Sequence, residues 1–134
     1  MDVGTLQSAL AEYFAPWVQE LGLKVDGFDA DSVTLRMPHS ERLSRVGGML
    51  CGQAMMAAAD TAMVLALINH LAVFRPCTTV QMNTSFLKPL SNQDALVQAR
   101  IVRAGKSIAF GEIDIRGADD GKSVCRASVT YALL

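Results

Sequence analysis

The chain has 134 residues and a mass of 14.4 kDa, within the usual size range of one domain. Its 12 lysines and arginines are balanced by 13 acidic residues, which gives a net charge of −1. Nucleic-acid-binding proteins normally carry a basic excess, so we expect no nucleic-acid partner. Hydrophobic residues make up 51% of the chain and charged residues 19%. This composition excludes a disordered chain and suggests that apolar surface is buried between subunits.

The cysteines and the most apolar stretch indicate the cellular environment. The 3 cysteines show neither CxxC spacing nor a zinc-ligand pattern, and they suit a reducing cytosol. We therefore expect a cytoplasmic protein without a metal or a cofactor. Residues 1–4 lack the basic and apolar regions of a signal peptide. Residues 54–68 are strongly apolar but contain Asp60, so they predict a buried helix rather than a membrane span.

The first part of the chain predicts a helix followed by two short strands. Apolar residues recur every three to four positions over residues 6–21, as on one face of an amphipathic helix, and Pro16 is expected to kink it or split off its last turn. That face comprises Leu6, Leu10, Phe14, Trp17 and Leu21. Residues 23–37 alternate like two strands around a turn at 29–31, and residues 38–44 are polar and loop-like.

Residues 52–71 are predicted to form the central helix. These 20 residues would span about 30 Å, and their Ala and Met content favours a helix that is apolar on nearly all sides. Such a helix must be wrapped by other elements. Residues 78–134 supply them as four predicted strands, which we expect to form an antiparallel meander curled round the helix: 78–87, 95–104, 108–116 and 123–133. The sequence thus predicts one α+β domain over residues 1–134.

Asp60 is the unusual residue of the central helix. Its neighbours at helical spacing are apolar, and an unpaired carboxylate there would cost several kcal/mol. One interpretation is a structural Asp, satisfied by a threonine hydroxyl or by an arginine of a partner. The other is a general base or nucleophile in an apolar pocket. The sequence leaves both open.

A glycine-containing loop leads into the start of this helix. Gly47 and Gly48 precede Gly52, whose backbone N–H lies in the first helical turn, where amides are unpaired and can hold a developing oxyanion. The alternative is an ordinary glycine-rich helix start. Asp60 lies eight residues further on, about 12 Å along the helix. One subunit therefore cannot easily place both groups on one substrate atom, whereas two helices packed side by side in a dimer could.

Two segments together resemble a known family. They are 51–62 (CGQAMMAAADTA) on the helix and 79–89 (TVQMNTSFLKP) on the following strand, and the likeness extends from about Leu23 to the C-terminus through the turns at 102–107 and 120–122. The chain resembles the hotdog-fold acyl-CoA thioesterases, especially the phenylacetyl-CoA thioesterase-like group. The resemblance implies an α+β hotdog fold, a long central helix wrapped by an antiparallel sheet. It also implies a dimer or dimer of dimers whose sites take Gly52 and Asp60 from opposite subunits.

The resemblance also implies roles for individual residues. It places the general base or nucleophile on Asp60, the oxyanion-hole glycine on Gly52 and the hydroxyl that orients the attacking water on Thr79. Two positions depart from the family pattern: Cys51 stands where a histidine is usual, and Arg45 where an asparagine is usual. We assign both, with Gln53 beside the glycine, to substrate binding.

The other candidates have structural alternatives. Cys51 at the helix start could be a nucleophile but is more often a small packing residue. Arg103 and Lys106 beside a turn could bind the phosphates of coenzyme A or could simply be solvated. Leu65 stands where hotdog hydratases need a histidine, which disfavours hydration. Four methionines in or just before the central helix could line an acyl tunnel or form core: Met49, Met55, Met56 and Met63.

The sequence therefore predicts an acyl-CoA thioesterase that releases a free acid and coenzyme A. In this hypothesis Asp60 activates water, Thr79 holds it and the Gly52 N–H polarises the carbonyl. The alternative is a non-catalytic acyl-CoA-binding or regulatory module on the same fold.

Overall fold

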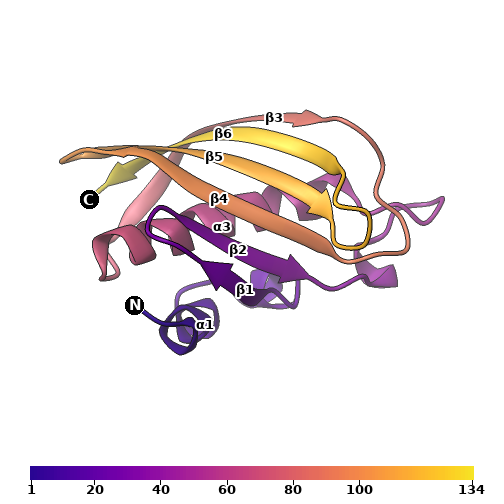
Figure 1. The fold of residues 1–134 in the computed structure, drawn as a ribbon, viewed down its shortest axis with the longest axis horizontal. Coiled ribbons are helices and arrows are strands. Elements are labelled where there is room, and N and C mark those ends of the chain that lie inside the picture. The colour runs from indigo at the N-terminus through magenta and orange to yellow at the C-terminus, as the bar shows by residue number, and fades with distance from the viewer.

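A single long helix, α3 (Gly52–Leu71), lies against a six-stranded antiparallel sheet (Figure 1). The computed structural model describes residues 1–134. The remaining elements, in chain order, are α1 (Val3–Glu12), α2 (Pro16–Gln19), β1 (Lys24–Phe28), β2 (Ser32–Met37), the 3₁₀ turn η1 (Glu41–Leu43), β3 (Cys77–Phe86), β4 (Ala95–Ala104), β5 (Ile108–Gly117) and β6 (Ser123–Leu133). The predicted α+β hotdog fold, with its central helix wrapped by an antiparallel sheet, is confirmed.

The strand order differs from the predicted meander. The sheet runs β1-β2-β4-β5-β6-β3, so only β4, β5 and β6 are consecutive neighbours. β3 pairs with β6 at the edge of the sheet, and the chain crosses from there to β4 (Figure 1). In a meander β3 would pair with β4. The physical reason that it does not is that β2, which has an apolar inner face, pairs along its whole length with that edge of β4. The prediction of a four-strand meander was wrong in this respect, and β3 is instead an edge strand next to α3.

The N-terminal helical region is divided at Pro16, as the sequence predicts. Helix α1 begins at Val3, where the Asp2 side chain accepts a hydrogen bond from the Thr5 N–H, and it ends at Glu12. Pro16 stands in the first turn of α2, a position that needs no N–H donor. Leu6 and Leu10 are buried, but Trp17 is 59% exposed rather than part of the core. The divided helix therefore presents its second half to a surface cavity instead of to the interior.

Helix α3 is the centre of the hydrophobic core. It packs mainly against β4 and β2, whose inward residues are almost fully buried. By length and apolar composition alone α3 could cross a membrane, but most of it is buried within this fold. The helix ends at Leu71, and the following residue, Ala72, adopts a left-handed conformation. Asp60 is the only charged residue of Asp, Glu, Lys or Arg type in this helix.

Candidate active site

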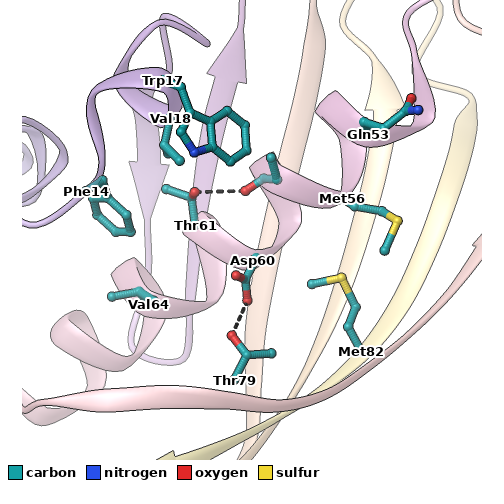
Figure 2. A pocket seen from close by; sticks show the side chains of 11 residues that line it. Phe14, Trp17, Val18, Gln53, Met56, Asp60, Thr61, Val64, Thr79 and Met82 are labelled. Atoms are coloured by element: carbon teal, nitrogen blue, oxygen red, sulfur yellow. Dashed lines mark hydrogen bonds between the residues drawn. The ribbon is translucent and has the colours of Figure 1, made fainter.

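The largest cavity lies beside the middle of α3, with a volume of about 490 Å³ (Figure 2). Three segments far apart in sequence form it: the α1–α2 region, one face of α3 and the edge strand β3. Most of the lining is apolar. The lining residues are Phe14, Trp17, Val18, Gln53, Met56, Ala57, Asp60, Thr61, Val64, Thr79 and Met82. A cavity of this size and composition, with one carboxylate in its wall, is typical of a small-molecule site.

Asp60 is held at one carboxylate oxygen by two hydroxyl groups. The Thr79 hydroxyl donates to Asp60 Oδ1 at 2.8 Å, and the Tyr131 hydroxyl donates to the same oxygen at 2.5 Å (Figure 2 shows the Thr79 contact). Neither bond uses Oδ2. No arginine or lysine forms a salt bridge with Asp60. The carboxylate is thus fixed in place while one oxygen keeps its lone pairs for a proton from water.

Tyr131 is the site residue that the sequence interpretation missed. It lies on β6, pairs in register with Thr79 of β3 and is only 2% exposed. Burial, and next the hydrogen bond to Asp60, raise the pKa of Tyr131 far above its ordinary value, so its hydroxyl remains a donor. The available signal was its inward position in an alternating strand, because a buried phenol requires a polar partner.

A second cavity, of about 410 Å³, lies at the N-terminal end of α3. Gly52 and Arg45 both line it, with Lys88 from the segment after β3. Gly47 and Gly48 before it have φ angles of 99° and 82°, which glycine adopts without strain. The Gly52 N–H, at the first position of the helix, has no hydrogen-bond partner. An unpaired amide beside two cationic side chains favours a ligand with developing or full negative charge.

The structure therefore divides the predicted site residues into two groups. Asp60, Thr79 and Gln53 line the first cavity, whereas Gly52 and Arg45 line the second. Neither of these two cavities contains both Asp60 and Gly52, in keeping with their separation along the helix.

The remaining candidates lie outside both cavities. Cys51 is the residue before α3, is half-buried and lines a smaller hollow beside Trp17 and Arg42. Arg103 and Lys106 are exposed near the turn between β4 and β5 and line neither cavity. A different cysteine, Cys77, lies close to Asp60; burial, and next the charge of Asp60, raise the pKa of its thiol. A neutral thiol is a poor nucleophile, so Cys77 does not compete with Asp60 for that role.

The four methionines of this region, Met49 before α3 and three within it, divide between core and cavity wall. Met63 is fully buried and Met55 is 3% exposed, although Met55 also contributes to the wall of the second cavity, as does Met49. Met56 is 38% exposed and lines the first cavity with Met82 of β3. Only some of the predicted tunnel residues are therefore available to a ligand.

Comparison with known proteins gives consistent matches. The profile of the Thioesterase superfamily matches residues 47–124, which include α3, β3 and most of the two cavities. A Thermoplasma acidophilum protein named "Putative esterase Ta0293" is 28% identical over 116 residues, covering 86% of each chain. The crystal structure of a "putative thioesterase" from Silicibacter sp. TM1040 has 27% identity and a TM-score of 0.89, covering 100% of this chain and 92% of that one. The Haemophilus influenzae thioesterase HI1161, at 23% identity, also has a TM-score of 0.89, covering 100% of this chain and 91% of that one, which shows the shared fold.

Proposed function

Because the chain belongs to the thioesterase superfamily, we propose that it hydrolyses acyl-CoA thioesters to a free carboxylic acid and coenzyme A. The observation that carries this proposal is the Asp60 carboxylate, held at Oδ1 by two hydroxyls, in the wall of an otherwise apolar cavity. A fixed base beside room for an acyl chain is what hydrolysis of a hydrophobic thioester requires.

The proposed reaction uses water as the nucleophile. Asp60 Oδ2 accepts a proton as the water oxygen bonds to the carbonyl carbon. The Thr79 hydroxyl proton is committed to Asp60, so its oxygen can hold that water by accepting a hydrogen bond. The carbon–sulfur bond then breaks, the pair of electrons leaves with sulfur, and the proton from Asp60 neutralises the thiolate. The acyl group occupies the apolar wall formed by Phe14, Trp17 and Met56.

The oxyanion contact is proposed to come from a second copy of the chain. Gly52 and Asp60 of one chain line separate cavities, so neither cavity alone holds both the base and the amide donor. A dimer, or a dimer of dimers, that places the Gly52 end of one α3 beside Asp60 of the other would complete the site. Arg45 would then stand at the mouth of this shared site, where a guanidinium pairs with phosphate or carboxylate.

The finer assignments rest on the sequence motifs. We place the chain in the phenylacetyl-CoA thioesterase-like group on residues 51–62 and 79–89, and we expect it to act in the cytoplasm. The reaction needs no metal or cofactor, because coenzyme A enters as part of the substrate. Arg103 and Lys106 are retained as candidate phosphate contacts only across an assembled interface, since they line neither cavity of the single chain.

The test is thiol release from a panel of aromatic and aliphatic acyl-CoAs. We expect turnover of at least one member that depends on Asp60, with the aromatic members deciding the subgroup assignment. Tight binding of an acyl-CoA without turnover above background would instead favour the non-catalytic binding module.

Mixing of two inactive variants tests the shared site. Each dimer of Asp60→Asn with Gly52→Pro would contain one site with both residues intact and one site with neither. After dissociation and random 1:1 mixing, half of the dimers are mixed, and each mixed dimer has one of its two sites intact. The mixture should therefore recover about a quarter of the wild-type activity. Mixing that restores no activity, although mass spectrometry shows mixed dimers, would contradict the shared site.

A further inference from the structure

The Tyr131 hydroxyl contacts the carboxylate of Asp60 although a backbone acceptor also lies within its reach. The hydroxyl lies 2.5 Å from Asp60 Oδ1 and 3.1 Å from the Asp60 backbone carbonyl oxygen. A phenol has one proton, and the charged carboxylate is the stronger and closer acceptor. The proton therefore points at the oxygen that Thr79 also contacts.

The two donors of Asp60 differ in how firmly they are held. Thr79 is exposed on an edge strand, whereas Tyr131 is 2% exposed on β6, between β5 and β3. A buried tyrosine ring has few alternative rotamers, so its hydroxyl is a rigid donor. Both donors approach Oδ1, which fixes the plane of the carboxylate and leaves Oδ2 without a hydrogen bond, on a residue that lines the cavity.

The state of protonation of Tyr131 suits a fixed donor rather than an acid or base. Its pKa is raised chiefly by burial, and then by the hydrogen bond to Asp60. The hydroxyl therefore keeps its proton throughout the pH range in which the protein would act. Such a group orients a neighbour but does not exchange protons during turnover.

We propose that Tyr131 is a positioning residue, which holds Asp60 Oδ1 from the core of the sheet so that Oδ2 faces the attacking water. The proposal rests on the proposed function, because it assigns the reacting oxygen of Asp60. It also predicts that Tyr131 acts only through Asp60.

Tyr131→Phe removes the hydroxyl and keeps the ring. We expect kcat to fall about tenfold with KM unchanged within about twofold, because the base is misoriented while the acyl cavity is intact. The only other tyrosine, Tyr13, stacks on Phe74 at a ring distance of 4.0 Å. Tyr13→Phe is therefore a matched control and should retain wild-type kinetics. A kcat for Tyr131→Phe within twofold of wild type would overturn the proposal.

A double-mutant cycle separates positioning from general structural damage. In the Asp60→Asn background the base is absent, so adding Tyr131→Phe should change the residual rate by less than about twofold. A purely structural role would lower the residual rate by the same factor as in the wild-type background, and that result would also overturn the proposal. Failure of the proposed function is a different outcome, because it is absence of turnover by the wild-type protein.

A measurement without turnover keeps the proposal testable even if Tyr131→Phe does not fold. In Tyr13→Phe protein Tyr131 is the only tyrosine, so its hydroxyl-bearing ring carbon can be followed by NMR at neutral pH after isotopic labelling of tyrosine. Adding Asp60→Asn replaces the charged acceptor of the Tyr131 hydroxyl by a neutral one and should shift this resonance. An unchanged resonance would mean that the carboxylate does not hold the hydroxyl, and the proposal would fail.

Discussion

In the proposed reaction, the middle of α3 and its N-terminal end have different roles. The middle holds a carboxylate with two hydroxyl donors beside an apolar cavity, which suits a base and an acyl chain. The N-terminal end holds an unpaired amide beside Arg45 and Lys88, which suits negative charge. Hydrolysis of a thioester needs both kinds of environment, and a single α3 keeps them apart. The difference between the two regions is therefore the strongest physical argument for an assembly of at least two chains.

The largest expected effect comes from removing the base. Asp60→Asn keeps an oxygen that can accept from Tyr131 and Thr79, so the fold should survive, but it abolishes basicity. We expect kcat to fall at least about 10²-fold, since positioned proton transfer contributes about 10²–10⁴. Steady-state thiol release, with circular dichroism as the check on folding, measures this.

Cys51→Ala is the control for that prediction. It should keep most of the activity, because Cys51 lines neither main cavity. A thiol nucleophile would give the opposite pattern, with an acyl-enzyme visible by mass spectrometry. Near-wild-type turnover by folded Asp60→Asn would show the mechanism to be wrong.

The second prediction tests the amide at the other end of the helix. Gly52→Pro deletes the N–H at the first helical position, where proline is tolerated, and the preceding Cys51 already has the extended conformation that proline requires, φ −73° and ψ 149°. Loss of one oxyanion donor costs about 10²–10³ in kcat, and we expect a loss at the lower end of that range.

Gly52→Ala separates the lost amide from the added bulk. A Cβ there would meet the ring of Phe86 at 3.2 Å, and that ring is 52% exposed and can move. Gly52→Ala should therefore lose only several-fold in kcat, clearly less than Gly52→Pro. Equal losses in the two variants would assign the effect to bulk rather than to the amide.

The third prediction concerns the cation beside Gly52. Arg45 has no carboxylate partner in the chain and lines the second cavity. Arg45→Ala should raise KM several-fold, or change the order of preference among acyl-CoAs, with a smaller effect on kcat for the best substrate. Arg42→Ala is the control, because Arg42 is an exposed arginine already paired with Glu20 at 3.5 Å. A loss confined to kcat would instead make Arg45 a residue of the transition state.

The sequence predicts the elements of this fold better than their arrangement. The alternation of residues 95–104 and 123–133 and the apolar run 52–71 are local signals, and the structure has β4, β6 and α3 at the same bounds. The position of β3 at the sheet edge depends instead on which strand pairs with β4. β2 and β3 compete for that pairing over a long sequence separation, and no local pattern predicts the outcome. Tyr131 was missed for the same reason, since 71 residues separate it from Asp60. Trp17 has helical spacing, but it lies in the separate helix α2 and lines the cavity instead of the core.

The smallest expected effect concerns the stability of the protein at high pH and involves two cysteines, one near Asp60 and one near Gly52. Cys77 lies near Asp60, and Cys125 pairs in register with Phe86, whose ring covers Gly52. Burial, and next the charge of Asp114, raise the pKa of Cys125 from 9.0 to about 11. The folded state therefore keeps this proton at a pH where the unfolded chain has lost it, so the associated stability is complete below about pH 9 and is lost as the pH rises towards 11.

We expect the free energy of unfolding to fall by roughly 1 kcal/mol between pH 8 and pH 10 through Cys125, given about 1.4 kcal/mol per pKa unit. Urea titrations across this range measure it. Cys125→Ala should be less stable at pH 8 because it leaves a small cavity, but its stability should fall less steeply with pH. Asp60→Asn should also flatten the dependence slightly, because it removes the negative charge that helps to raise the pKa of Cys77. If both variants keep the wild-type dependence of the free energy of unfolding on pH, ionisation of these thiols does not control stability. The two ends of α3 would then differ in their proposed chemistry but not through the cysteines beside them.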